Sequence, residues 1–371
     1  MLLSFLVSIH AVVISALYFF LPIYLQGSLF FSGAQIGLLY GVLGLNSLLA
    51  AFPVGVVGDR YPARILTRLG LAATAVNLWG LARAERFWPF FLLFFAFGLS
   101  LQLYRQSLDI MLFKENDAAG RTRRFGNYNA WRMGGMTAGI FLGGISLYFL
   151  DYPRTFQLLA VLLLGLVAIT WRLPLTRGPR TPLLQYGRDF LSGPVLFFVT
   201  WLFLFTMHWG AEGTSLGLFL KNNLGLNSVG VGLYLAGEFS VVALTAYLYG
   251  RGGAERLSPF PLLALGLATS GLGHILMTYP NLAWSFGWRL VHGFGDGLIM
   301  MITYTTIARL FQVDRIGGNA GLISLATTLG VLTGSLFYGP LGASFGYQLP
   351  LIISGLTSLA LIPLAYVGLK G

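Results

Sequence analysis

The stretch AQIGLLYGVLGLNSLLAAFPVGVV at residues 34–57 contains no charged side chain. A helix needs about 20 mostly apolar residues to cross a hydrocarbon core of about 30 Å, and this stretch is long enough. Two of its glycines, Gly37 and Gly55, have counterparts 195 positions further on, at Gly232 and Gly250. The stretch therefore predicts a membrane-spanning helix and also an internal repeat.

The same offset of 195 residues joins glycines in several other segments. The further pairs are Gly98 with Gly293, Gly126 with Gly321, Gly135 with Gly330, and Gly139 with Gly334. One match among 49 glycines would be a coincidence, but one offset recurring along half of the chain indicates two similar halves. Many membrane transporters are built from such repeats.

The composition is that of an integral membrane protein: 56% of the residues are hydrophobic, only 9% are charged, and the mean hydropathy is +0.76. Apolar stretches recur at approximately 3–25, 34–57, 65–83, 88–113, 125–149, 154–173, 194–220, 228–250, 259–279, 282–309, 318–340 and 346–368. They predict an all-α fold of twelve transmembrane helices, arranged as two six-helix bundles related by a pseudo-two-fold repeat. The predicted domains are an N-terminal bundle at 1–173, a cytoplasmic linker at 174–192 and a C-terminal bundle at 193–371.

Basic residues set the expected orientation. They gather in the loop after residue 57 and in the linker, which also contains Pro174, Pro179 and Pro182. The positive-inside rule places this side in the cytoplasm, and with it both termini of a multi-pass protein of the cell (inner) membrane. The net charge of +11 would also suit nucleic acid. Because these charges flank helices in short loops, we expect contacts with anionic membrane lipids and no nucleic-acid partner.

The loop GVVGDRYPAR at residues 55–64 resembles a motif of the major facilitator superfamily, Gly-x-x-x-Asp-Arg-x-Gly-Arg-Arg. Pro62 and Ala63 depart from that motif, and GRGGAER at 250–256 is a degraded second copy. The glycines at 135–144 resemble the superfamily's fifth-helix motif, with Ile140 in place of its proline. The resemblance implies a transporter of two six-helix bundles that works by alternating access.

A carboxylate followed by arginines at the end of a helix can stabilise one conformation of a two-state element. We therefore predict a gating role for Asp59, Arg60 and Arg64, although the positive-inside rule alone would explain Arg64. Arg105 and Asp109 lie near the same end of the fourth predicted helix. For them we prefer gating over substrate binding.

Few charges lie within the predicted helices, and each is costly in hydrocarbon, so each should face a cavity or a partner. Arg289, His292 and Asp296 follow at i, i+3 and i+7 and share one helical stripe. The glycines at 293, 295 and 297 are expected to leave open space around it. His208 and Glu212, four residues apart, also share a face.

These residues predict proton coupling, because protonation of a buried carboxylate responds to desolvation and to neighbouring cations. The candidate proton carriers are Asp296, Glu238 and Glu212. The candidate substrate-binding residues are Arg289, His292, His208, Arg132 and Trp131. A structural Arg289–Asp296 ion pair is the alternative for that pair, and Arg132 fits either the substrate or the gating set. His10 and His274 are expected to be packing residues.

Three classes of function are possible for such a chain. The first is a proton-coupled secondary active transporter for a small polar or anionic organic solute, which the intramembrane arginines favour. The alternative is a proton-coupled multidrug efflux antiporter, or a passive transporter, for lipophilic compounds. A membrane enzyme or receptor lacks support, because no catalytic constellation, cysteine or His-x-x-x-His spacing is present. We expect no cofactor and no metal, with a small-molecule substrate, protons and lipids as the partners of a monomer.

Overall fold

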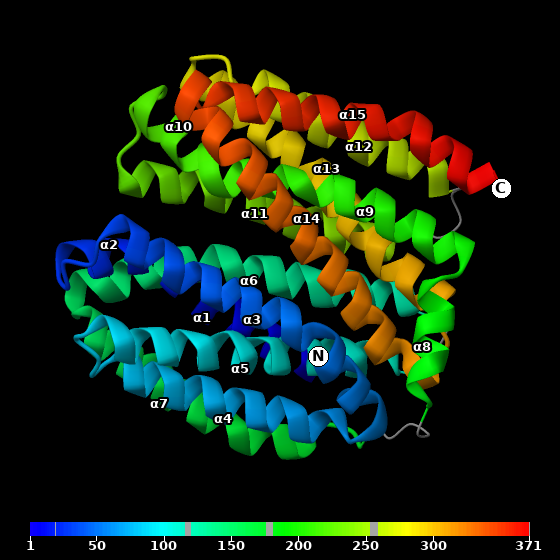
Figure 1. The fold of residues 1–371 in the computed structure, drawn as a ribbon, viewed down its shortest axis with the longest axis horizontal. Coiled ribbons are helices and arrows are strands. Elements are labelled where there is room, and N and C mark those ends of the chain that lie inside the picture. The colour runs from blue at the N-terminus through cyan, green and yellow to red at the C-terminus, as the bar shows by residue number, and fades with distance from the viewer. Residues whose placement is uncertain (19, 116–119, 176–180, 253–258, 371) are drawn as a thin grey trace. The chain divides into compact units, whose positions relative to one another are not determined.

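The computed structural model describes residues 1–18, 20–115, 120–175, 181–252 and 259–370, and all regular secondary structure in these ranges is helical (Figure 1). Arg177 and Arg180 of the predicted linker lie outside the described residues. So do Glu255 and Arg256 of the degraded loop copy. The expectation of an all-α chain is confirmed.

Local signals explain where helices of the first half begin. Ser32 and Gln35 form a capping box, with Gln35 N donating to Ser32 Oγ (3.2 Å) and Ser32 N to Gln35 Oε1 (2.9 Å). Asp151 caps α7 by accepting Arg154 N at 2.8 Å, and Pro153 occupies the first turn. The helices are α1 (Leu2–Tyr18), α2 (Leu21–Gly27), α3 (Gly33–Arg60), α4 (Ala63–Leu81), α5 (Phe87–Phe113), α6 (Arg121–Phe149), α7 (Tyr152–Ile169) and η1 (Thr170–Arg172).

The second half continues with a short helix of the linker region and then long apolar helices. They are α8 (Leu183–Phe190), α9 (Gly193–Ala211), the π-helical turn η2 (Glu212–Leu216), α10 (Gly217–Asn222), α11 (Ser228–Arg251), α12 (Pro259–Leu276), α13 (Leu282–Leu310), η4 (Val313–Arg315), α14 (Ile316–Phe345) and α15 (Gln348–Lys370). Among the described residues, seven helices are long and apolar enough to cross a membrane. The number of twelve crossings stays a prediction.

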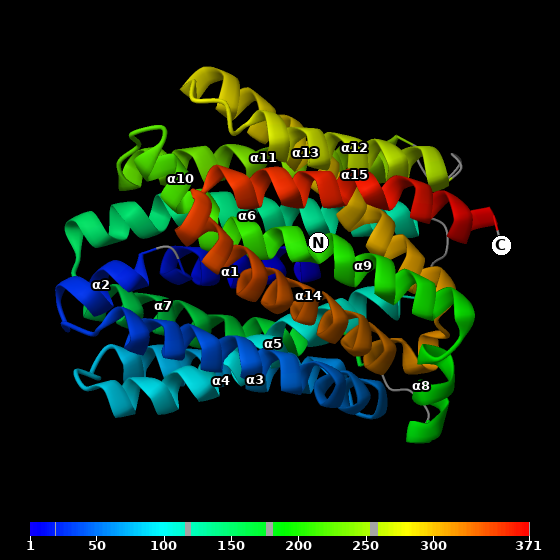
Figure 2. The same cartoon turned by 45° about the horizontal axis from the view of Figure 1, so that its top comes forward.

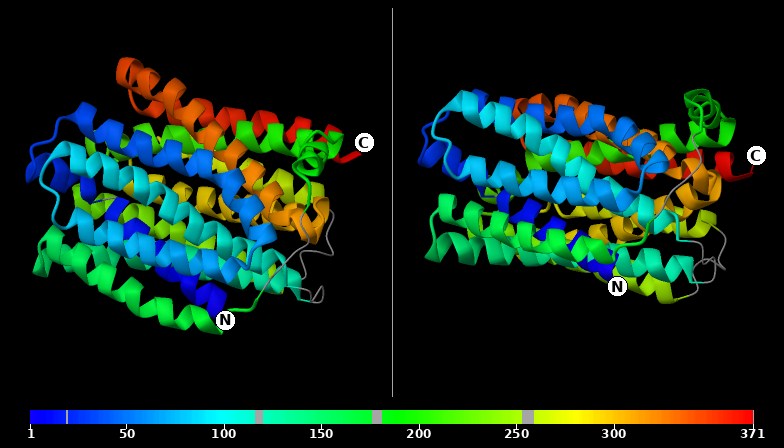
Figure 3. Two further views of the ribbon diagram at one scale, coloured as in Figure 1. Left: turned by 60° about the horizontal axis from the view of Figure 1, so that its bottom comes forward. Right: turned by 90° about the horizontal axis from the view of Figure 1, so that it is seen from below.

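Two compact units share these helices. Unit 1 comprises Met1–Asn116, Gly135–Gly187 and Phe311–Leu325, and unit 2 comprises Asp117–Gly134, Arg188–Leu310 and Ala326–Gly371. In unit 1, α5 packs against α3 and α4, and α4 against α7. In unit 2, α13 packs against α11 and α12, and α12 against α15 (Figures 2 and 3). Both α6 and α14 are continuous helices whose two ends belong to different units.

Close contacts within each unit confirm the 195-residue repeat. A side chain at Gly126 would meet the carbonyl oxygen of Ala246 in unit 2. Its counterpart Gly321 would meet the carbonyl oxygen of Ala51 in unit 1, and both partners of this contact are displaced by 195 positions. Two further contacts recur in the same way. The contact of Gly135 with Ser8 is repeated 195 positions later as Gly330 with Phe203. The contact of Gly139 with Val12 is repeated as Gly334 with Met207. The glycines recur because helix backbones touch at these points.

Candidate functional site

Arg289 of α13 is the centre of a buried ionic cluster inside unit 2. Only 1% of its surface is exposed. Its Nη1 lies 2.6 Å from Glu212 Oε1, at the start of the π-helical turn, and its Nη2 donates to Glu238 Oε2 on α11. The alternative prediction, an ion pair between Arg289 and Asp296, was therefore wrong, because the partners of Arg289 are Glu212 and Glu238. One guanidinium instead bridges two carboxylates from two other helical segments.

Asp296, one turn beyond His292 on α13, is bound by neutral and imidazole donors. Ser270 Oγ donates to Asp296 Oδ1 at 2.8 Å, and Trp209 Nε1 donates to Oδ2 at 2.8 Å. His208 Nε2 lies 3.2 Å from the same Oδ2 atom. Thus α9 and α12 enclose this carboxylate together with its own helix.

His292 faces all three acids of the cluster. Its Nε2 is 2.9 Å from Glu212 Oε1, 3.7 Å from Asp296 Oδ1 and 3.8 Å from Glu238 Oε1. Its Nδ1 lies 2.9 Å from the carbonyl oxygen of Ser270. The ring is fully buried, so the acids and this imidazole interact without water between them.

His274 of α12 belongs to the same cluster, which corrects its assignment as a packing residue. Its Nε2 lies 2.8 Å from Glu212 Oε1 and its Nδ1 2.8 Å from Ser354 Oγ on α15. Its ring stacks on that of His292 with centroids 4.1 Å apart. Ser270 and His274 form a polar stripe on an otherwise apolar helix, and this pattern in the sequence could have indicated that His274 belongs to a polar cluster. His10 lies elsewhere, in unit 1, with Nε2 3.3 Å from the Leu101 carbonyl oxygen.

Glycines bring the helices of the cluster together. A Cβ atom at Gly293 would lie 2.9 Å from Glu238 Cγ, and one at Gly273 would lie 2.6 Å from His292 Cβ. One at Gly295 would lie 2.5 Å from Ser270 N. The expected open space around this stripe was wrong, because the glycines admit neighbouring helices instead of leaving a gap.

A second polar site surrounds Asp59, at the end of α3 in unit 1. Asp59 is fully buried, and it accepts the backbone N–H groups of Gly317 (2.9 Å) and Gly318 (2.7 Å) at the start of α14. Lys114 Nζ lies 3.0 Å from Asp59 Oδ1. A carboxylate at a helix N-terminus satisfies free amide donors and interacts favourably with the helix dipole.

Tyr186 of α8 adds a donor to this carboxylate, with its hydroxyl 3.1 Å from Asp59 Oδ2. Burial, and then the negative charge of Asp59, raise the pKa of the Tyr186 hydroxyl above its ordinary value. The two predicted arginines of the loop bind backbone instead. Arg60 Nη2 donates to Thr181 O at 3.0 Å, and Arg64 Nη1 to Leu173 O at 3.4 Å.

Arg105 also reaches the part of α14 that belongs to unit 1. Its Nη2 donates to Ser324 Oγ at 3.1 Å, while Asp109, one turn further along α5, is partly buried. In unit 2, Arg132 Nη1 donates to the hydroxyl of Tyr304 at 3.3 Å, and Trp131 is 49% exposed. The structure therefore joins Arg105 to the helix that Asp59 binds, and places Arg132 and Trp131 outside the contacts of the Arg289 cluster given above.

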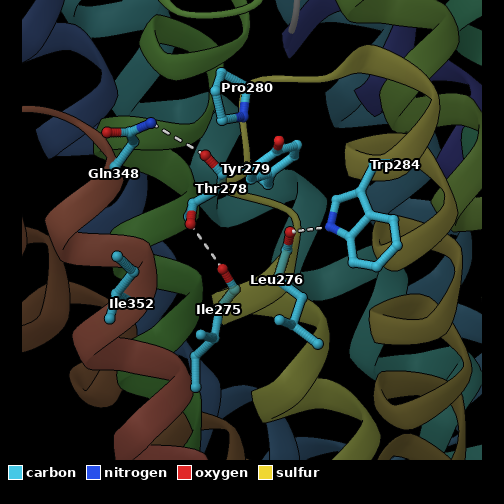
Figure 4. Close-up of a pocket in the computed structure, with 8 residues that line it drawn as sticks. All are labelled: Ile275, Leu276, Thr278, Tyr279, Pro280, Trp284, Gln348 and Ile352. Atoms are coloured by element: carbon cyan, nitrogen blue, oxygen red, sulfur yellow. Dashed lines mark hydrogen bonds between the residues drawn. The ribbon is translucent and has the colours of Figure 1, made fainter.

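A pocket of about 650 Å³ opens where α12 ends and α13 and α15 begin (Figure 4). Its walls are mostly apolar. Two of its polar groups bind backbone: Trp284 Nε1 donates to Leu276 O (3.0 Å) and Gln348 Nε2 to Thr278 O (3.0 Å). None of the predicted site residues lines it.

Comparison with known proteins decides the family. Residues 3–259 and 202–370 match the family model described as Major Facilitator Superfamily. The chain belongs to the major facilitator superfamily. A solved structure with a similar fold is the human organic anion transporter MFSD10 (TETRAN), with a TM-score of 0.79 and 18% sequence identity, covering 98% of this chain and 97% of that one. At this identity the likeness concerns the fold.

In this major facilitator superfamily protein, two sets of donor atoms lie within 4.8 Å of one another, as metal ligands do: His208 with His292 and Asp296, and Glu212 with His274 and His292. The carboxylates of both sets already accept hydrogen bonds, Glu212 from Arg289 and Asp296 from Ser270 and Trp209. A metal ion would have to displace these donors.

Sequence reasoning missed several partners in this superfamily member. Lys114 and Tyr186 bind Asp59 from distant parts of the chain, and Ser270 and Trp209 bind Asp296. Trp209 follows His208 directly, but nothing in the sequence pairs an indole with a carboxylate on another helix.

Proposed function

We propose that this membrane transporter is a proton-coupled secondary active transporter. It moves a small polar or anionic organic solute across the cytoplasmic membrane by alternating access, with both termini in the cytoplasm. The observation that carries the proposal is the buried cluster in which Arg289, three carboxylates and three imidazoles contact one another.

Burying so many ionisable groups in a membrane protein costs free energy, which indicates that the cluster has a role other than stability. An Arg, Lys or Asp side chain at the centre of a transmembrane helix costs about 2.5–3.5 kcal/mol to insert. Replacing a buried ionic set by apolar side chains is often neutral or stabilising, so stability alone explains it poorly. Imidazoles and carboxylates in contact exchange protons near neutral pH, and every proton gained or lost changes which groups attract one another. Protonation can thereby be linked to helix rearrangement.

The Asp59 site supplies the gate in this proposal. Asp59 and Arg105 hold the first turns of α14 to α3 and α5, and Lys114 pairs with Asp59. The later turns of α14 belong to unit 2. Release of the Gly317 and Gly318 amides would free the start of α14. The contact is therefore suited to stabilise one state of the alternating-access cycle.

The intramembrane arginines favour a polar or anionic cargo, and Arg132 and Trp131 remain the proposed substrate contacts. Arg289, His292 and His208 affect substrate binding indirectly in this proposal, because the charge of their cluster is linked to the arrangement of the helices. The three acids would instead suit lipophilic cations if the protein were a multidrug efflux antiporter. Organic anion transport is a property of human MFSD10, and the proposal for this chain rests on its own residues.

The testing experiment is thermal unfolding of the purified protein with a ligand panel at about pH 5.5 and about pH 8, followed by uptake into proteoliposomes with an imposed pH gradient. Ligands that bind the native state raise its apparent stability by mass action. We expect a pH-dependent shift with one class of polar or anionic solute, and uphill accumulation driven by the gradient. Shifts with many unrelated lipophilic cations would replace the proposal by the efflux antiporter.

A further inference from the structure

We propose that the Arg289 cluster holds two exchangeable protons, one on His208 and one on His292, while His274 stays neutral. Resting on the proton-coupled transport proposed above, the inference names these two imidazoles as the groups that give up and regain protons in a cycle. Two independent arguments lead to the same number.

The first argument starts from backbone carbonyl groups, which accept hydrogen bonds and cannot donate them. His208 Nδ1 lies 2.6 Å from the carbonyl oxygen of Phe205, and His292 Nδ1 lies 2.9 Å from that of Ser270. Ser270 Oγ also lies 3.3 Å from His292 Nδ1, but its hydrogen is donated to Asp296 Oδ1. Both Nδ1 atoms must therefore carry hydrogen. In a neutral imidazole, the other nitrogen, Nε2, would then hold a lone pair.

In both rings, that second nitrogen faces carboxylate oxygen. His208 Nε2 is 3.2 Å from Asp296 Oδ2, and His292 Nε2 is within 3.8 Å of Glu212, Glu238 and Asp296. The closest His292 contact, to Glu212 at 2.9 Å, lacks the directional geometry of a hydrogen bond and acts through charge. A lone pair among buried carboxylates would be repelled, so each of these Nε2 atoms carries a second proton.

The facing carboxylates are poor places for these protons. Both oxygens of Asp296 already accept hydrogen bonds, from Ser270 Oγ and Trp209 Nε1 at 2.8 Å each. Glu212 Oε1 accepts from Arg289 Nη1 at 2.6 Å. Glu238 Oε2 accepts from Arg289 Nη2. Donors directed at all three carboxylates stabilise their charged forms, and the protons are left to the imidazoles.

His274 differs because its Nδ1 faces a hydroxyl group. Ser354 Oγ, at 2.8 Å from Nδ1, lies also 2.9 Å from the Leu351 carbonyl oxygen, and a hydroxyl can donate to either acceptor. With the hydroxyl hydrogen directed to Nδ1, neutral His274 donates from Nε2 to Glu212 Oε1 at 2.8 Å. A neutral His274 also avoids a second charge 4.1 Å from the stacked ring of His292.

The second argument is electrical neutrality. The ionisable side chains that meet here are His208 of α9, Glu212 of η2, Glu238 of α11 and His274 of α12, with Arg289, His292 and Asp296 of α13. α15 contributes the hydroxyl of Ser354, and the Tyr234 hydroxyl on α11 is bound to Ser285 (2.8 Å). Three carboxylates and one guanidinium leave two negative charges. A cluster removed from water is least costly when neutral, so it takes up two protons, which the hydrogen-bond argument places on His208 and His292.

The chain suits a direct count, because it contains only four histidines. Protein with 15N-labelled histidine, reconstituted in lipid at about pH 7, would be studied by solid-state NMR, which distinguishes imidazolium from each neutral tautomer. Gln substitutions at His10, His208, His274 and His292 assign the signals. We expect imidazolium at His208 and His292, neutral His274 with hydrogen on Nε2, and hydrogen on Nε2 of His10, which faces the Leu101 carbonyl. A neutral His208 or His292, or a charged His274, would overturn the proposal.

A charge variant tests the neutrality argument separately. Asp296→Asn removes one negative charge, so the number of imidazolium rings in the cluster should fall from two to one, with His208 the one that loses its proton. Glu85→Gln, at an exposed position of unit 1, should leave the number at two. An unchanged number in Asp296→Asn contradicts the argument. A different result would contradict the proposed function. If transport did not depend on pH while NMR still showed two imidazolium rings, proton coupling would be excluded and the number of protons in the cluster would remain two.

Discussion

Asp59 on α3 accepts the backbone N–H of Gly318 at 2.7 Å, so that a buried carboxylate closes the first turn of a helix more than 250 residues away in the chain. The same oxygen receives the Tyr186 hydroxyl, and the other oxygen receives Gly317 N and faces Lys114. Four donors on one carboxylate make this contact sensitive to any change at Asp59.

Asp59→Asn should destabilise unit 1 and shift the balance of transport conformations. The substitution leaves Lys114 buried beside a neutral amide, and breaking a buried ion pair costs about 3–5 kcal/mol. Thermal unfolding measures the loss, and distances between spin labels, one in each unit, measure the shift. The double variant Asp59→Asn with Lys114→Met should regain part of the stability. If label distances stay at their wild-type values, Asp59 has no part in gating.

Tyr186→Phe should remove one hydrogen bond to a charged acceptor, worth about 1.5–3 kcal/mol, without changing the fold of α8. Because the pKa of Tyr186 is raised in the folded protein, its contribution is complete below the unfolded pKa of about 10 and is lost as the pH rises further. Unfolding measured at about pH 9 and about pH 11 should therefore show a smaller alkaline loss in the variant. Equal losses in both proteins would exclude this hydroxyl as a contributor.

Asp296→Asn should abolish accumulation driven by a pH gradient while the protein still folds and binds ligand. The amide is isosteric. With its oxygen directed at Trp209 Nε1, its NH2 group can donate to Ser270 Oγ, but it cannot hold the charge that balances His208. Proteoliposome uptake with and without the gradient separates coupling from binding. Glu85→Gln, which changes the net charge equally at an exposed position, is the control. Full gradient-driven uptake in Asp296→Asn would take this residue out of the proton path.

Gly126→Ala and Gly321→Ala should each destabilise the protein by about 1–3 kcal/mol, because the added methyl group enters a helix–helix contact at a carbonyl oxygen. Gly37→Ala, where nothing lies within 4 Å of the new Cβ, should be neutral or stabilising by up to about 1 kcal/mol. Thermal unfolding of the three variants checks the pattern. Matching losses at positions 126 and 321 are expected from the repeat, and a loss at only one of them would contradict its structural equivalence.

The sequence by itself determined the helical fold, the repeat and the superfamily. Long apolar stretches can be satisfied in a membrane only by helices, because their backbone groups must bond within the segment. The glycines at 126 and 321 revealed the repeat because contact between backbones excludes other side chains at both places. Asp59 was found for a similar reason: a carboxylate at the end of an apolar helix stands out locally from its neighbours.

Only the tertiary structure decided which buried charges meet. The helical stripe of Arg289, His292 and Asp296 was visible in the sequence, but Arg289 binds Glu212 and Glu238 while Asp296 binds His208. His274, which we expected to be a packing residue, joins them. Helical periodicity gives the face on which a side chain lies, and says nothing of which face of which other helix lies opposite. That choice depends on the glycine contacts that bring α11, α12 and α13 together, and it is made by residues far apart in the chain.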